Sequence, residues 1–181
     1  GLYFMERVKL ILIMGVPASG KTEVAKSVIK QIKAVYLDNN FIADSFFPHT
    51  RVDKEYRKIR QSIYESLYRI TSENLKLGNS VVLDVPHVTH MKDKNWQFEI
   101  CKLANNANAE LKIIRCYCSE EILKKRIIER GEERDNWKLT NWDEFLKKEP
   151  ILVEIPFDHI DINTEENTEE NIKKILEYLS S

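Results

Sequence analysis

Residues 15–22 read GVPASGKT and match the phosphate-binding pattern G-x-x-x-x-G-K-[ST]. The glycines of this pattern let successive backbone N–H groups face a phosphate at the start of a helix, where anions are favoured. Lys21 would reach the β- and γ-phosphates of a nucleotide, and the Thr22 hydroxyl would help to hold Mg²⁺. The pattern therefore predicts a nucleotide-phosphate site, and a purely structural glycine turn is the alternative.

One continuous segment is predicted to bind the nucleotide. It consists of Gly15, Val16, Pro17, Ala18, Ser19, Gly20, Lys21, Thr22 and the following Glu23. The segment follows an apolar, β-branched run at 8–13 and precedes a helical apolar pattern at 24–32. Strand, glycine-rich loop and helix, in this order, are the context that the motif requires.

Buried strands alternate with helical patterns along the rest of the chain. Short apolar runs predict further strands at 34–37, 80–85, 111–118 and 159–162. Apolar residues at helical spacing predict helices at 56–77, 91–104, 119–130 and 168–179, and a short helix or loop at 41–47. Alternation without hairpin signals predicts an α/β fold, in which a parallel sheet is covered by helices on both faces.

Two aspartates, Asp38 and Asp84, come where predicted strands end. Ligands of parallel sheets bind beyond the carboxyl ends of the strands, so both carboxylates should lie near the phosphate loop. Asp84 is predicted to act in catalysis and, with Thr22, to hold Mg²⁺, and a capping aspartate is the alternative. Asp38 is a candidate general base for an attacking hydroxyl, and an Asx turn is its alternative.

Three arginines recur every four residues after the fourth predicted strand, namely Arg126, Arg130 and Arg134. On one helix this spacing makes a single cationic stripe. Arginines at such a position can stabilise the charge that develops during phosphoryl transfer. We predict catalytic roles for Arg126 and Arg130 and nucleotide contacts for Arg130 and Arg134, and an exposed face of salt bridges is the alternative.

Composition limits the classes of protein. The 28 Lys and Arg residues balance the 29 Asp and Glu residues, so no global basic field favours a protein that coats duplex nucleic acid. The cysteines, Cys101, Cys116 and Cys118, form no C-x-x-C pair, which indicates reduced thiols and a cytoplasmic setting. Cys116 and Cys118 should fill the core from one face of a strand, because they are two residues apart.

No segment reads as a membrane span. No run approaches the roughly 18 apolar residues of a membrane helix, and the N-terminus has no signal-peptide layout. Residues 1–4 resemble part of a protease-site tag, which leaves a single expected domain at 5–181.

Several segments together resemble the small P-loop kinases. They are the phosphate loop, Leu37-Asp38-Asn39-Asn40, the run Gly78-x-x-V-V-L-D and Leu123-Lys124-Lys125-Arg126-x-x-x-Arg130-Gly131. Within those kinases the chain is most similar to the group of phage-type polynucleotide 5′-kinase domains and zeta toxins. The resemblance implies ATP, Mg²⁺ and a three-layer fold whose five-stranded sheet has the order 2-3-1-4-5. By position it implies that Lys21 and Thr22 bind phosphate and metal, and that Arg126 and Arg130 lie in a lid at about 126–148.

The segment after the second strand departs from the family pattern. The relatives usually read D-x-[ILF]-[RK] there, with the Asp as general base, whereas the aligned positions here are Asn40 and Ala43. An amide cannot take up the proton. Either Asp38 or Asp44 therefore substitutes as the base, or the acceptor chemistry differs.

The segment after the third strand departs as well, because the chain reads DVPH at 84–87 where relatives often have D-x-[TA]-[NF]. His87 and His90 are expected at the surface, with contact to an acceptor as the alternative. Further on, Trp142 and Phe145 either dock a helix onto the domain or cover the nucleotide, with Arg134 or Lys138 near phosphate.

Two classes of function remain. The first is a kinase that transfers the γ-phosphoryl group of ATP to a hydroxyl, on a small molecule most simply and on a nucleic-acid end otherwise. The second is a nucleotide-binding regulatory ATPase or switch that has no phosphoryl acceptor. A G protein is disfavoured because D-x-x-G after the third strand and N-K-x-D are both missing from the sequence. Arginines within the chain favour transfer over switching. We expect no membrane partner and a monomer or homodimer.

Overall fold

A five-stranded parallel sheet forms the centre of the computed structural model, which describes residues 7–49, 51 and 54–181. The strands are β1 (Lys9–Met14), β2 (Ala34–Asp38), β3 (Ser80–Asp84), β4 (Glu110–Tyr117) and β5 (Ile160–Asn163). Their order in the sheet is β2-β3-β1-β4-β5. The α/β class and the strand order that the sequence predicts are confirmed, whereas the tag-like residues 1–4 lie outside the described part of the chain.

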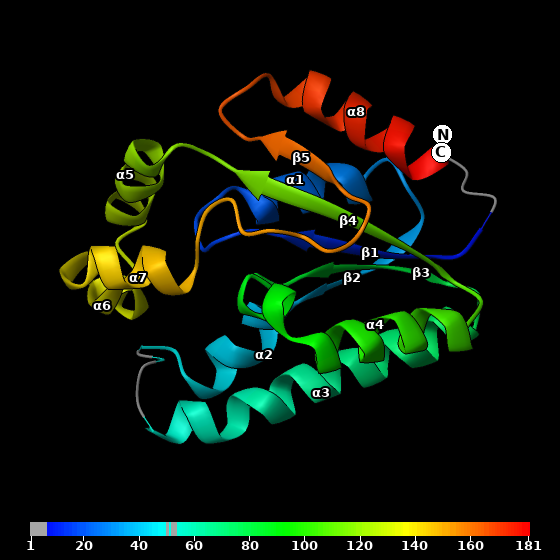
Figure 1. Ribbon diagram of the computed structural model, residues 1–181, viewed down its shortest axis with the longest axis horizontal. Coiled ribbons are helices and arrows are strands. Elements are labelled where there is room, and N and C mark those ends of the chain that lie inside the picture. Colours follow the sequence, from blue (N-terminus) through cyan, green and yellow to red (C-terminus); the bar gives the residue numbers. More distant parts are fainter. Residues whose placement is uncertain (1–6, 50, 52–53) are drawn as a thin grey trace.

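Helices cover both faces of the sheet (Figure 1). The α-helices are α1 (Lys21–Ile29), α2 (Asn39–Phe46), α3 (Lys54–Lys76), α4 (Lys94–Asn106), α5 (Glu120–Arg130), α6 (Asn136–Thr140), α7 (Trp142–Lys148) and α8 (Thr168–Ser180), and short 3-10 helices are η1 (Thr89–Lys92) and η2 (Glu133–Asp135). Figure 1 shows α3 and α4 on one face, α1 and α8 on the other, and α5, α6 and α7 beyond the end of β4. Within the described ranges, no helix has the length and apolar character needed to span a membrane.

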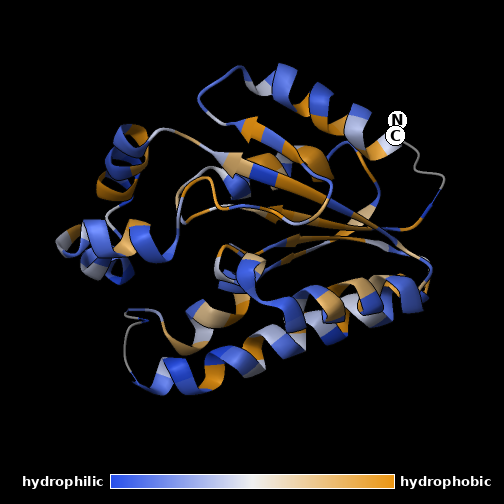
Figure 2. Ribbon diagram, viewed as in Figure 1, coloured by the Kyte–Doolittle hydropathy of each residue, from blue (hydrophilic) through white to orange (hydrophobic). Residues whose placement is uncertain are grey.

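The central strand β1 divides its side chains between two apolar layers. Leu10 and Leu12 belong to the layer that contains the buried side chains of α3 and α4, whereas Ile11 and Ile13 belong to the layer of α1 and α8. All four side chains are fully buried, as expected for a central parallel strand with helices on both faces. Figure 2 shows the result, with apolar strands inside and polar outer helix surfaces. Burial on both faces fixes the register of β1 and hence the position of the loop that follows.

The helix predicted at 91–104 begins later than its apolar spacing indicates. Residues Thr89–Lys92 form η1, and α4 starts at Lys94. The Asp93 side chain caps α4 by accepting a 3.1 Å hydrogen bond from the Trp96 backbone N–H. Met91 is buried although it lies before the helix, which explains why it fitted the helical pattern.

The expectation that Cys116 and Cys118 point to one face of a strand is wrong. Strand β4 ends at Tyr117, so Cys118 no longer follows the alternation of the strand. Cys116 packs in the layer of α1 and α8, and Cys118 packs in the layer of α3 and α4. Both thiols are buried and free, so both cysteines fill the core, but from opposite sides of the sheet.

Gly15, the first residue of the phosphate loop, has no room for a side chain. Its φ is +145°, and an added Cβ would overlap the backbone carbonyl oxygen of Cys116 in the neighbouring strand. Gly131, which follows α5, also has a positive φ of +60°, but an added Cβ there would meet open space. The two positions therefore separate the cost of crowding from the cost of a left-handed backbone.

We expect Gly15→Ala to lower the free energy of unfolding by about 3 kcal/mol or more, because backbone strain and overpacking each cost roughly 1–3 kcal/mol. Gly131→Ala is the matched control and should cost only about 1–2 kcal/mol. Urea unfolding of the nucleotide-free protein measures both losses. Equal losses would show that the Cys116 carbonyl does not crowd the loop.

Candidate functional site

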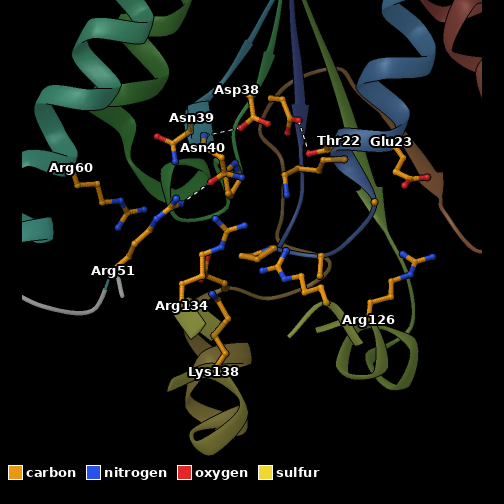
Figure 3. Close-up of a pocket in the computed structure, with 18 of the residues that line it drawn as sticks. Thr22, Glu23, Asp38, Asn39, Asn40, Arg51, Arg60, Arg126, Arg134 and Lys138 are labelled. Atoms are coloured by element: carbon orange, nitrogen blue, oxygen red, sulfur yellow. Dashed lines mark hydrogen bonds between the residues drawn. The ribbon is translucent and has the colours of Figure 1, made fainter. Parts of the chain in front are cut away.

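A cavity of about 520 Å³ is bordered by the phosphate loop, the ends of β2 and β3, the α2–α3 region and the α5–α7 region (Figure 3). The predicted site residues that line it are Pro17, Ala18, Gly20, Lys21, Thr22, Glu23, Asp38, Asp84, Arg126, Arg130 and Arg134. Gly15, Val16 and Ser19 are buried in the same loop. The structure therefore brings the residues that the sequence singled out to one place, beyond the carboxyl ends of the strands.

The phosphate loop presents Lys21 to the cavity at the start of α1. Its Nζ donates a 3.2 Å hydrogen bond to the Val16 carbonyl oxygen. Burial lowers the pKa of Lys21, and the negative charge of Asp84 opposes this shift. The buried Oγ of Ser19 has no hydrogen-bond partner among the described residues. A buried cation and an unpartnered buried hydroxyl are groups that an anionic ligand would satisfy, so the loop fits a phosphate.

Two carboxylates and two hydroxyls meet at the ends of β2 and β3. Asp84 Oδ2 accepts a 2.9 Å hydrogen bond from the Thr22 hydroxyl and a second one, also of 2.9 Å, from the Tyr36 hydroxyl. The Tyr36 hydroxyl also lies 3.4 Å from Asp38 Oδ2. Burial and then the charge of Asp84 raise the pKa of Tyr36, so the phenol keeps its proton and remains a donor.

Asp38 caps a helix and lines the cavity at the same time. Its Oδ1 accepts a 2.8 Å hydrogen bond from the Asn40 backbone N–H, so the alternative of a local turn is present. Burial, and then the nearby charge of Asp84, raise the pKa of Asp38. A carboxylate with a raised pKa is a stronger base than an ordinary one. The cap uses one oxygen, and Oδ2 remains on the side of Tyr36 and Asp84.

Thr22 and Asp84 offer the oxygen ligands that Mg²⁺ prefers. Among the residues that the structure describes, no group of three or more His, Cys, Asp and Glu side chains could hold a metal ion. Mg²⁺ is usually bound through one or two carboxylates together with substrate phosphates, not by a cage of protein ligands. The donor set therefore fits Mg²⁺ that arrives with a nucleotide.

The arginines do not form one helical stripe, and this prediction is wrong. Helix α5 ends at Arg130, and Arg134 lies in η2, after the turn at Gly131. All three arginines, Arg126 included, nevertheless line the cavity. The four-residue spacing indicated three residues that line one cavity, although α5 ends at the second of them.

Arg126 and Arg130 both have partners within the protein. Arg126 Nη1 donates a 2.8 Å hydrogen bond to Thr164 Oγ1, which in turn lies 2.7 Å from the Ser19 carbonyl oxygen. Arg130 forms a bidentate pair with Asp135, with distances of 2.5 and 2.7 Å. Thr164 thus connects the loop after β5 to the phosphate loop and to α5, and no pattern in the sequence indicates this contact.

The segment after α5 docks onto the domain and also reaches the cavity. Phe145 is only 1% exposed, and Trp142 Nε1 donates a 2.9 Å hydrogen bond to Glu120 of α5. The docking interpretation is therefore confirmed for both aromatic residues. Lys138 from the same segment lines the cavity, and its role beside phosphate stays a prediction.

The expectation of surface histidines is wrong for His87, which is 1% exposed. Its Nε2 lies 2.9 Å from the Tyr68 hydroxyl, which also accepts a 2.9 Å hydrogen bond from Trp96 Nε1. His90 is half-buried beside it, and burial lowers the pKa of His90 to about 4. Neither histidine lines the cavity; His87 is buried in the core, and the His90 ring packs against it.

Sequence reasoning missed Tyr36. Arg51 and Arg60 line the cavity and belong to the segment 41–60, in which the sequence leaves several residues as equally ambiguous acceptor candidates, Arg51 among them. Tyr36 has a readable signal, because it precedes Asp38 by two residues in a strand and so shares its face. Arg60 has no such signal, because it lies on α3 two residues after Lys58, an exposed lysine paired with Glu55. Only the tertiary structure shows that Arg60 lines the cavity and that Lys58 does not.

The strand order of the sheet and the position of the phosphate loop are those of the small P-loop kinase fold. A family model described as an AAA domain (AAA_33) matches residues 10–149, and the chain belongs to this family. Among curated proteins no match was found.

Three solved structures illustrate the similarity of fold. A candidate kinase from Chloroflexus aurantiacus J-10-fl has a TM-score of 0.75 and 17% identity, over 96% of this chain and 99% of that one. A sugar kinase from Janibacter sp. HTCC2649 has a TM-score of 0.68 and 17% identity, over 95% and 94% of the two chains. The APS kinase CysC of Mycobacterium tuberculosis, in complex with AMPPNP and APS, has a TM-score of 0.60 and 18% identity, over 97% and 99%.

We expect Asp38→Asn to raise the unfolding midpoint of the nucleotide-free protein at neutral pH. Asn is an equally good N-cap, and the substitution removes a buried charge beside Asp84. Because the folded pKa of Asp38 lies above its ordinary value of 3.8, wild-type stability falls as the pH rises through that window. The advantage of Asp38→Asn should therefore disappear on acidification toward pH 3.8. Thermal unfolding at a series of pH values measures it, and a lower midpoint at neutral pH would contradict the assigned electrostatics.

Proposed function

We propose that this protein is an ATP-dependent kinase that transfers the γ-phosphoryl group to a hydroxyl of a small-molecule acceptor. One observation carries the proposal: Lys21, the Thr22–Asp84 pair and a second carboxylate, Asp38, all border one cavity. Phosphoryl transfer asks little covalent chemistry of the protein and depends on positioning and charge stabilisation. The family and the kinase structures of the same fold support this class of reaction.

The phosphate loop would bind the donor. Its backbone N–H groups and the Lys21 ammonium hold the β- and γ-phosphates, and Thr22 and Asp84 hold Mg²⁺ directly or through its water. When bound, Mg²⁺ supplies neutralisation of the negative charge on the transferring phosphoryl group. Tyr36 keeps Asp84 oriented toward Thr22 by donating to the same carboxylate oxygen.

Asp38 would serve as the base for the acceptor hydroxyl. Asp44, the other candidate, is about half exposed and is paired with Arg51 and Arg134, whereas Asp38 lines the cavity. Asn40, at the position of the family base, accepts a 2.7 Å hydrogen bond from Arg51. Asp38 Oδ2 would accept the proton as the hydroxyl oxygen attacks the γ-phosphorus.

The region 126–148 would act as a lid over the phosphates. It contributes Arg126, Arg130, Arg134 and Lys138 to the cavity. Arg126 and Arg130 would stabilise the negative charge that grows on the transferred group during the reaction. Closure of such a segment also excludes water, which would otherwise compete with the acceptor.

The free thiols, two of them buried, fit a cytoplasmic setting.

A regulatory ATPase without an acceptor is the second candidate. The observation that favours it is that Arg126 and Arg130 are bound by Thr164 and Asp135. An arginine held in this way would have to leave its partner before it could serve transfer. A nucleotide switch would instead keep these contacts and hydrolyse ATP slowly.

Consumption of ATP with and without a panel of hydroxyl compounds separates the two candidates. The kinase proposal predicts that at least one small hydroxyl compound increases ADP release and becomes phosphorylated in equal amount. Lys21→Ala should lower kcat/KM by a factor of about 10² or more, because it removes a cation that stabilises the transferring phosphates. Its unfolding midpoint without nucleotide should match the wild type, since Lys21 is a desolvated cation whose intended partner is the nucleotide.

Two results would contradict the proposal. The first is slow ATP hydrolysis that no hydroxyl compound accelerates, which would favour the regulatory ATPase. The second is a large loss of stability in nucleotide-free Lys21→Ala, which would make Lys21 a structural residue.

A further inference from the structure

The end of the cavity at Asn39 and Asn40, where we expect the acceptor to bind, carries more cations than carboxylates. Figure 3 shows Arg51, Arg60 and Arg134 on the side of Asn39 and Asn40, away from the side of Thr22 and Glu23. These arginines come from three parts of the chain, the segment before α3, α3 itself and η2, and Arg134 of η2 is distant in sequence from the other two. Their convergence is a property of the fold and not of one charged helix face.

Two of these arginines share one carboxylate. Arg51 and Arg134 both pair with Asp44 Oδ1, the latter at 2.9 Å. The two arginine side chains are only 12% and 17% exposed, whereas Asp44 is 54% exposed. Burial, and then the like charge of Arg134, lower the pKa of Arg51. One exposed carboxylate thus faces two largely buried guanidinium groups.

The same imbalance recurs in the lid. Arg130 and Lys138 share Asp135, at distances of 2.5 and 2.8 Å from its carboxylate oxygens. Four cations of the cavity therefore divide two carboxylates among them. Glu149 also lines the cavity, but burial raises its pKa and so disfavours its charged form.

Two further observations, at Arg51 and at Arg60, favour an anionic ligand. Arg51 Nε is buried without a hydrogen-bond partner among the described residues. Arg60 Nη2 donates a 3.3 Å hydrogen bond to the Tyr64 hydroxyl, Arg60 Cζ lies 5.3 Å from the centre of the Tyr64 ring, and no described carboxylate forms an ion pair with Arg60. Guanidinium groups with unused N–H donors bind oxyanions well, because the planar donors match carboxylate and phosphate oxygens.

We propose that the acceptor is a small hydroxyl compound that itself carries an oxyanion, a phosphate or a carboxylate, bound by Arg51, Arg60 and Arg134. This inference rests on the proposed kinase function and adds the chemical class of the acceptor. The cavity of about 520 Å³ has the size of a small-molecule site, which favours a small molecule over a polymer end. The anion holds the acceptor while its hydroxyl faces Asp38.

The test uses wild-type protein saturated with AMPPNP and Mg²⁺, so that the phosphate loop is filled. Inorganic phosphate is then titrated by calorimetry, and the turnover of matched pairs is measured with ATP: glycerol against glycerol 3-phosphate and glycerate, and ribose against ribose 5-phosphate. We expect phosphate to bind to the AMPPNP complex, and the charged member of a pair to have a kcat/KM about tenfold or more above the neutral one. Comparison of the phosphorylated and carboxylated members identifies which oxyanion is preferred.

Arg60→Gln and Arg134→Gln should weaken phosphate binding about tenfold and remove most of the preference for the charged member. Lys58→Gln, an exposed substitution on α3 near Arg60, is the matched control and should change neither. Arg60→Lys keeps the charge but loses the fork, and should fall between the wild type and Arg60→Gln. It also remains informative if one glutamine variant unfolds.

Different failures separate this inference from the kinase proposal. Efficient transfer to neutral hydroxyl compounds, or to a 5′-hydroxyl oligonucleotide in preference to every small molecule, would overturn the inference and leave the kinase proposal standing. Loss of AMPPNP binding in Arg60→Gln as large as the loss of phosphate binding would assign the arginine to the nucleotide and overturn it too. No transfer to any acceptor, despite tight binding of AMPPNP, would contradict the kinase proposal itself.

Discussion

The hydrogen bond from the Thr22 hydroxyl to Asp84 Oδ2, 2.9 Å long, connects the start of α1 to the end of β3. It depends on the parallel sheet, because β1 and β3 pair directly and end at the same edge. Tyr36 adds a second donor to the same oxygen from β2. Three neighbouring strands thus place a lysine, a hydroxyl and a carboxylate around one point, and the rest of the cavity lining is arranged about it.

Positive and negative charges are distributed unevenly over the site. Near the strand ends, burial and then the charge of Asp84 disfavour the charged form of Asp38. Beyond them, arginines and a lysine outnumber the carboxylates that pair with them. Like charges held close together lower the stability of the folded protein when no ligand is bound, and a bound metal and bound anions would offset this loss of stability. The site is therefore organised for ligands and less for the stability of the free protein.

The sequence predicted the parts of the molecule whose physical signals are local. The glycine-rich loop has a fixed spacing, the buried strands are unbroken apolar runs, and the resemblance implied the strand order. The start of α4 was misplaced because the Asp93 cap outweighed the apolar spacing, and Cys118 was misplaced because β4 ends one residue before it. In both cases a single residue at an element boundary decided the outcome.

The rest of the site depends on contacts between residues distant in sequence. His87 is buried because Tyr68 and Trp96, from α3 and α4, close over it. Arg134 lies in η2, after the end of α5, and pairs with Asp44 of α2, and Arg51 contacts Asn40 and Asp44. Neither spacing nor composition reports such contacts, so a single sequence could name these residues only as candidates.

Calorimetric titration with AMPPNP, in the presence and absence of Mg²⁺, measures whether Thr22 and Asp84 bind a metal together with a nucleotide, as we propose. We expect Mg²⁺ to strengthen binding to the wild type, and Asp84→Asn to lose about 10- to 100-fold of this gain. Binding without Mg²⁺ should change little in Asp84→Asn, because Lys21 and the loop backbone remain. Equal Mg²⁺ dependence in the two proteins would show that Asp84 does not help to bind the metal.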